Sequence, residues 1–243
     1  MNKIWEDRII LIAGDSWACG EWGRNVNGYD VIHYGLSEYL IEENYKIINL
    51  GFPGGGNKMT ITRINDFLKL NPKFNIVNII VFQTEWNRYE ITLDDISYGY
   101  LNLKNKLISE FYQGCSKIST TYNIPVQLIG GCSDTSWIDD FHINYPGISI
   151  VCQSLTNLVL NGNHRIINPV HSMFTTNSIN QLELFKKNLN QNDLKLLLHD
   201  MDQGNDRLKT WRENDKFFWP DGRHANRRSH KILFNFLKEQ NIF

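Results

Sequence analysis

Three features are scarce in this sequence: long hydrophobic runs, cysteine, and an excess of charge of either sign. No apolar run is long enough to cross a bilayer, so we expect no membrane-spanning helix. The 243 residues carry 25 lysines and arginines against 26 aspartates and glutamates, a formal net charge of -1. Because nucleic acids and anionic membranes attract strongly basic proteins, this balance argues against both as partners.

The first residues also lack the features of a secretion signal. The apolar run at 9–13 follows three charged residues and ends before Asp15, whereas a signal peptide needs an uninterrupted apolar core. No two cysteines form a C-x-x-C pair, which argues against a zinc knuckle and a dense disulfide framework. The four cysteines are Cys19, Cys115, Cys132 and Cys152. We therefore expect a reduced, cytoplasmic setting, and association with a virus particle or release by lysis would agree with it as well.

Four short apolar runs predict strands that are buried on both faces of a sheet. They lie at 8–14, 46–51, 75–83 and 124–131. Their apolar character is continuous rather than alternating, as in a parallel sheet covered by helices. Segments with helical spacing separate the runs, at 30–45, 59–71 and 98–123. The sequence thus predicts an α/β fold, a three-layer α/β/α sandwich with a mostly parallel, flavodoxin-like sheet.

The second half of the chain is less regular. We expect one domain over 1–243, with a loop-rich insertion around 132–172 near the edge of the sheet. Within that insertion, 165–170 is a candidate last strand. A polar segment at 177–214 has helical spacing, and 225–240 predicts an amphipathic helix that closes the domain.

The tripeptide Gly14-Asp15-Ser16 directly follows the first predicted strand. Glycine allows the chain to turn there, and α/β proteins bind ligands beyond the carboxyl ends of their strands. Ser16 is therefore a candidate nucleophile. The alternative is that Asp15 or Ser16 only caps the helix that follows.

A serine nucleophile needs a base and a group that orients the base, and the other end of the chain offers both. Asp221 and His224 lie three residues apart in a turn before the last predicted helix. At that spacing the carboxylate can fix the imidazole tautomer and stabilise its charged form. Taken alone, the pair also fits a simple turn in which His224 caps the helix.

Together the two motifs resemble those of the SGNH, or GDSL-type, hydrolase family, which has its serine in G-D-S and its base in D-x-x-H. The resemblance implies a catalytic triad of Ser16, His224 and Asp221. It also implies an oxyanion hole, for which Gly54, rather than Gly51 or Gly55, matches the glycine of the second block. For the asparagine of the third block, usually G-x-N-D, the sequence offers Asn87, with Gln83 or Thr84 as alternatives.

Two other functions remain open. The glycines of 51–56 approach a phosphate-binding loop, but Asn57 separates them from Lys58, and Met59 stands where that loop needs Ser or Thr. Nucleotide binding therefore ranks below hydrolysis. The incomplete third block favours the other alternative, a weak or inactive glycan-binding or structural module on the same fold.

The resemblance implies a serine esterase that removes a small acyl group, acetyl above all, with carbohydrate esters as expected substrates. It implies no cofactor, and none of the seven histidines belongs to a recognisable metal-binding pattern. Expected partners are small-molecule or glycan ester substrates, without nucleic acid or membrane. The sequence leaves the oligomeric state open.

Overall fold

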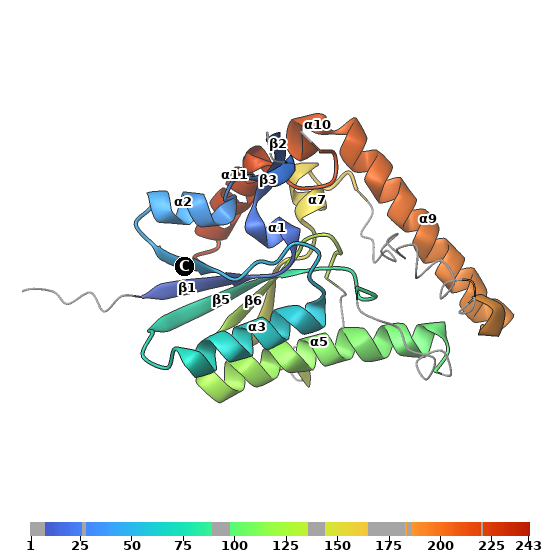
Figure 1. Ribbon diagram of the computed structural model, residues 1–243, viewed down its shortest axis with the longest axis horizontal. Coiled ribbons are helices and arrows are strands. Elements are labelled where there is room, and N and C mark those ends of the chain that lie inside the picture. Colours follow the sequence, from blue (N-terminus) through green and yellow to red (C-terminus); the bar gives the residue numbers. More distant parts are fainter. Residues whose placement is uncertain are drawn as a thin grey trace, which may run out of the picture.

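A parallel sheet of five strands forms the centre of the protein in a computed structural model (Figure 1). The structure describes residues 8–25, 28–88, 98–135, 144–164, 183, 186–219 and 221–243. In spatial order the strands are β4 (Lys46–Asn49), β1 (Ile9–Ala13), β5 (Ile76–Gln83), β6 (Val126–Gly130) and β7 (Ile148–Cys152). Each strand is parallel to its neighbours. In chain order this is 2-1-3-4-5, the flavodoxin-like arrangement, so the predicted fold class is confirmed.

Helices cover both faces of the sheet because its strands are apolar on both sides. In β1, Ile9 and Leu11 belong to one hydrophobic core, whereas Ile10 and Ile12 belong to the other. The first face packs against α3 (Asn57–Leu70) and α5 (Tyr100–Tyr122). The second packs against α2 (Leu36–Glu42), α7 (Leu155–Val159) and α11 (Arg227–Glu239). These layers form the predicted sandwich.

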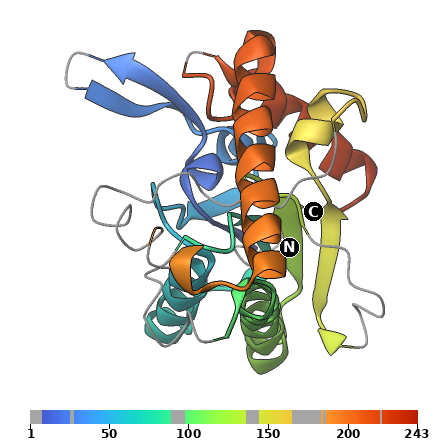
Figure 2. The ribbon, with the colours of Figure 1, turned by 90° about the vertical axis from the view of Figure 1, so that its right-hand side faces the viewer.

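The long helix α9 (Gln191–Glu213) passes in front of the sheet in Figure 2 and leads into the short helix α10 (Asp215–Phe218). Near its middle α9 is hydrogen-bonded to α5: Asp200 accepts hydrogen bonds from the Tyr100 hydroxyl at 2.5 Å and from the Lys104 ammonium at 2.6 Å. Near its C-terminal end Trp211 packs in the core between the sheet and α11. The helix thus bridges both layers beside the carboxyl ends of the strands.

Two segments differ from the sequence-based expectation. Residues 30–33 belong not to a helix but to an antiparallel hairpin of β2 (Glu21–Asn25) and β3 (Gly28–His33), and the helix begins only at Leu36. Ile32, within the segment where helical spacing predicted a helix, is 45% exposed. The hairpin is possible because Gly20, at φ +123°, lies so close to β3 that a Cβ would be 2.2 Å from the His33 carbonyl oxygen.

The other difference lies in the expected insertion at 132–172. It contains β7, the fifth strand of the sheet, and α7, so this part of the chain contributes to the core rather than only to loops. The candidate strand at 165–170 lies outside the described residues. None of the helices in the described ranges combines the length and apolar character needed to cross a membrane.

Candidate active site

Ser16 lies in a tight turn between β1 and the short helix α1 (Ser16–Cys19). Gly14 has φ +143°, and a Cβ there would be 2.8 Å from the Phe82 carbonyl oxygen, so the turn requires glycine. Asp15 is the N-cap of α1, and its Oδ1 accepts a hydrogen bond from the Trp17 amide at 2.9 Å. Capping is therefore the role of Asp15, which leaves the Ser16 hydroxyl free for another partner.

That partner is His224, whose Nε2 lies 2.8 Å from Ser16 Oγ. On the other side of the imidazole, Nδ1 makes a short hydrogen bond with Asp221 Oδ2. The two residues lie in a turn at Gly222, which has φ +65°. Asp221 Oδ1 accepts the backbone amides of Arg223 at 2.9 Å and His224 at 3.0 Å, so the same carboxylate fixes both the turn and the imidazole.

The electrostatics of Asp221 favour an ionised carboxylate. Burial by itself would raise the pKa of Asp221, but the hydrogen bond and charge of His224, with the two backbone amides, hold it below its ordinary value. An ionised carboxylate only accepts hydrogen bonds, so the imidazole proton belongs on Nδ1. The lone pair of Nε2 then faces the Ser16 hydroxyl, which is the arrangement needed to remove its proton.

A cavity of about 350 Å³ opens beside this serine and histidine. Gly54 lies in its wall with φ +72° and open space where a Cβ would be. Within the described part of the chain, no group accepts the backbone N–H of Gly54. Trp22, also in the wall, donates its indole N–H to the Ser16 carbonyl oxygen at 2.8 Å, and its ring centroid lies 5.7 Å from that of His224. The indole thus holds Ser16 and covers the histidine.

The segment after β5 differs from the pattern that the family resemblance implies. Asn87 is buried and does not line the cavity; Glu85 and Arg88 from the same segment do. The two alternatives to Asn87 have other partners: the Gln83 side chain accepts a hydrogen bond from the Tyr112 hydroxyl at 3.0 Å, and the Thr84 hydroxyl donates one to Glu85 at 2.8 Å. Sequence reasoning thus missed the charged residues of this segment, although they directly follow a buried strand.

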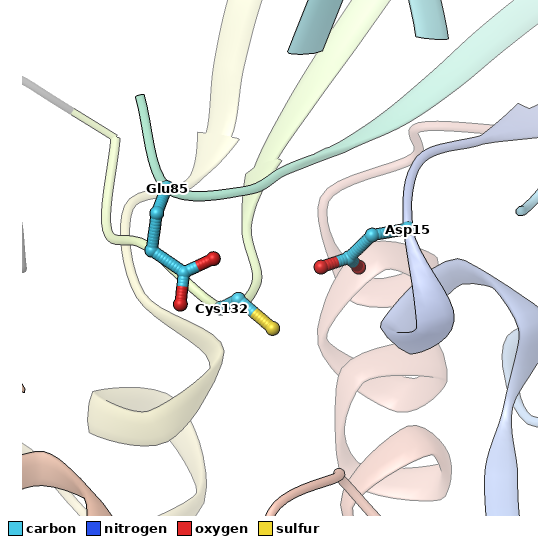
Figure 3. Close-up of side chains that lie close together, drawn as sticks. All are labelled: Asp15, Glu85 and Cys132. Carbon is cyan, nitrogen blue, oxygen red and sulfur yellow. The ribbon is translucent and has the colours of Figure 1, made fainter. Parts of the chain in front are cut away.

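Arg88 ties together a cluster of three side chains from the loops after β1, β5 and β6, shown in Figure 3: Asp15, Glu85 and Cys132. Its Nε lies 2.6 Å from Glu85 Oε2, its Nη1 lies 3.3 Å from Asp15 Oδ2, and its Nη2 lies 3.8 Å from Cys132 Sγ. Burial alone would lower the pKa of the guanidinium, but the carboxylates of Glu85 and Asp15 raise it above its ordinary value.

The same three side chains could also be considered as metal ligands, because their ligand atoms lie within 4.8 Å of one another. Burial, together with Asp15 and Glu85, raises the pKa of the Cys132 thiol well above its ordinary value, so the sulfur carries its proton, whereas a metal binds thiolate. The Arg88 guanidinium already supplies positive charge to both carboxylates. The donor set therefore suits a guanidinium better than a metal ion.

Arg207 reaches the same cavity from α9, in a part of the chain that carried no predicted site residue. Its side chain is 4% exposed, its Nη2 donates to Glu85 Oε1 at 3.0 Å, and its guanidinium lies 4.6 Å from the centre of the Trp211 ring. The Trp211 indole in turn donates to the Thr156 hydroxyl at 3.0 Å. Packing and hydrogen bonds thus hold the Arg207 guanidinium in the cavity wall.

No protein-family model and no curated protein sequence matches this chain. Among solved structures it is similar to a lipase/acylhydrolase from Enterococcus faecalis, with 15% identity over 96% of this chain and 94% of that one, at a TM-score of 0.39. A member of the lipolytic G-D-S-L family from Veillonella parvula has 16% identity over 96% and 97%, at 0.41. AlinE4, an SGNH-hydrolase family esterase, has 20% identity over 75% and 94%, at 0.39. With likenesses this distant, function has to be argued from the chain's own residues.

Proposed function

We propose that this protein is a serine esterase in which Ser16 is the nucleophile, His224 the general base and Asp221 the group that orients the base. The observation that carries the proposal is the 2.8 Å contact between Ser16 Oγ and His224 Nε2, which joins residues 208 positions apart. The short hydrogen bond from His224 to Asp221 continues it. A capping serine or a turn histidine would need neither contact.

The proposed reaction has two halves. Ser16 Oγ attacks the carbonyl carbon of the ester while its proton passes to His224 Nε2, and the carbonyl oxygen becomes an oxyanion. When the tetrahedral intermediate collapses, the bond to the alcohol breaks and His224 returns the proton to the departing alkoxide oxygen. Water then attacks the acyl-serine with His224 again as base, releasing the carboxylic acid and regenerating Ser16.

The oxyanion needs hydrogen-bond donors that are already in place. We assign the backbone N–H of Gly54 to this role, together with that of Ser16, because both residues line the cavity. Asn87 remains the third donor that the family resemblance implies, and Arg88 is its rival because its guanidinium lies in the cavity wall. Loss of one donor is expected to raise the barrier by about 3 kcal/mol.

The proposed substrate is an ester of a small acyl group, acetyl above all, on a carbohydrate or similar alcohol. Two observations support it: the cavity is small, about 350 Å³, and the partly exposed indole of Trp22 lines it. Indole rings offer apolar faces on which a sugar ring can pack. The proposal keeps two expectations from the sequence, a cytoplasmic location and no cofactor.

The test compares hydrolysis of p-nitrophenyl acetate by the wild-type protein, by Ser16→Ala and by Ser109→Ala. Ser109, a serine on α5, is the matched control because it does not line the cavity. We expect activity in the wild type and the control and none in Ser16→Ala, with a fluorophosphonate probe attached to Ser16. Equal rates in the wild type and Ser16→Ala would refute the proposal.

The second candidate, a glycan-binding or structural module without activity, is favoured by the segment after β5. There an ion-paired arginine lines the cavity instead of an asparagine. This alternative predicts no hydrolysis of any ester, no labelling of Ser16, and binding of a glycan that Ser16→Ala leaves unchanged. Turnover that depends on Ser16 would exclude it.

A further inference from the structure

The wall of the cavity beside Ser16 is rich in arginine. Arg88, Arg207 and Arg223 all line it, whereas Glu85 is the one carboxylate among the described lining residues. Arginine guanidinium groups keep their charge at every physiological pH, so three permanent cations face one small space. Arg88 is ion-paired and is a candidate oxyanion donor, but an ester with a neutral alcohol would make no use of the charges of Arg207 and Arg223.

Arg207 is the most informative of the three because it is buried and only partly satisfied. One of its nitrogens, Nη2, donates to Glu85, but Nε and Nη1 are buried and have no hydrogen-bond partner among the described residues. Leaving donors of a charged group unpaired in a buried place is unfavourable, and native proteins rarely do so without a functional reason. Because Glu85 is its one ion-pair partner among the described residues, Arg207 leaves positive charge in the cavity wall that an anionic ligand can offset.

The surrounding carboxylates do not neutralise this wall evenly. Asp15 and Glu85 both form ion pairs with Arg88, and Glu85 is shared with Arg207. Asp221 lies behind His224 and accepts hydrogen bonds from the imidazole and from two backbone amides.

Arg223, which is exposed next to His224, makes no ion pair within 4.0 Å with an acidic residue of the described ranges. The positive charge of the cavity wall that is not fully offset therefore belongs to Arg207 and Arg223.

We propose that this cavity binds a carboxylate on the alcohol part of the substrate, held by Arg207 and Arg223 beside the ester that Ser16 attacks. The inference rests on the proposed function. An acetyl group carries no ionisable group, so the negative charge must belong to the alcohol part of the ester. A single negative charge fits better than a dianionic phosphate, since Glu85 lines the same cavity and repels a second charge. The natural substrate class would be acetyl esters of hydroxy acids or acidic sugars.

The kinetic test compares release of acetate from 3- and 4-acetoxybenzoate and from their methyl esters, in which a neutral ester replaces the carboxylate of the alcohol part. We expect the wild type to prefer the better of the two anionic esters in kcat/KM by about tenfold or more, an effect of charge-assisted hydrogen bonds. Arg207→Gln and Arg223→Gln should reduce this preference at least severalfold, mainly through a higher KM for the anionic ester. Higher salt should reduce it as well.

Arg228→Gln is the matched control, since Arg228 is an exposed arginine of α11 outside the cavity. Its preference should equal that of the wild type. The inference is overturned if the wild type does not prefer the anionic ester, or if Arg207→Gln and Arg223→Gln keep the wild-type preference. Should Arg207→Gln fail to fold, the exposed Arg223→Gln decides the matter by itself.

A binding measurement separates this inference from the proposed function. Ser16→Ala protein is titrated calorimetrically with the two acetoxybenzoates and with their methyl esters, so that no turnover is needed. Tighter binding of an anionic compound, lost on adding Arg223→Gln, supports the carboxylate site even if the wild type cleaves nothing. Equal binding of anionic and neutral compounds, with Ser16-dependent cleavage of the neutral esters, refutes the carboxylate site and leaves the esterase intact.

Discussion

Replacing Asp221 by asparagine tests the proposed machinery at the residue farthest from the substrate. In the wild type, Oδ2 accepts the Nδ1 proton of His224, and Oδ1 accepts two backbone amides. Asparagine has only one oxygen. If that oxygen keeps the hydrogen bonds from the two backbone amides, the new NH2 group faces Nδ1 of His224. Nδ1 must then give up its proton and act as an acceptor.

The imidazole proton would then sit on Nε2 and point at Ser16 Oγ, so His224 could no longer act as the base. We therefore expect kcat to fall by about 10⁴, equivalent to about 5.5 kcal/mol of barrier. In the opposite rotamer the asparagine oxygen would still accept the Nδ1 proton, so the tautomer would be kept. Its NH2 group would then face the backbone N–H groups of Arg223 and His224, and the two hydrogen bonds that hold the turn would be lost. With the first rotamer both turn contacts survive, so the free energy of unfolding should change by less than about 1 kcal/mol.

The assay measures kcat with p-nitrophenyl acetate near neutral pH, where the lowered pKa of Asp221 keeps the wild-type carboxylate ionised. Urea unfolding of each variant checks that the fold is retained. Asp215→Asn is the control, because Asp215 is an exposed carboxylate of α10 outside the cavity lining. A folded Asp221→Asn protein with wild-type kcat would refute the assignment of Asp221 as the orienting group.

Three further predictions concern stability and the oxyanion hole. Because Asp15 caps α1, Ser16→Ala should change the free energy of unfolding by at most about 0.5 kcal/mol, whereas Asp15→Ala should cost about 1 kcal/mol or more; urea unfolding that ranks them the other way would make Ser16 the structural residue. If Asn87 is an oxyanion donor, Asn87→Ala should lower kcat at least about 100-fold, and an unchanged kcat would leave that role to Arg88. Burial, with His33 nearby, lowers the pKa of His230 to about 3, below the value of about 6.5 in the unfolded chain. The unfolded state therefore binds a proton that the folded state does not, and the contribution of this histidine to stability should fall by about 2 kcal/mol between about pH 6.5 and pH 5. Chemical unfolding at both pH values should show a smaller loss in His230→Gln, and an identical loss would contradict this.

Much of the architecture follows from local sequence patterns. The strands β1, β4, β5 and β6 lie within a few residues of the predicted runs, because a strand buried on both faces has to be apolar throughout. The hairpin of β2 and β3 escaped prediction, since a short exposed ribbon has no continuous apolar pattern. β7 is only partly buried at the edge of the sheet, and its pattern is correspondingly weak.

The sequence by itself also determined the two halves of the proposed machinery. The turn at Gly14 and the turn from Asp221 to His224 are each set by residues within a few positions, so a short motif is enough to specify them. What lines the cavity was decided only by the tertiary structure. Arg207 meets Glu85 across 122 positions, and no local pattern encodes such a contact. The choice between Asn87 and Arg88 depends on how a few residues after β5 turn toward or away from the cavity, which packing decides and spacing does not.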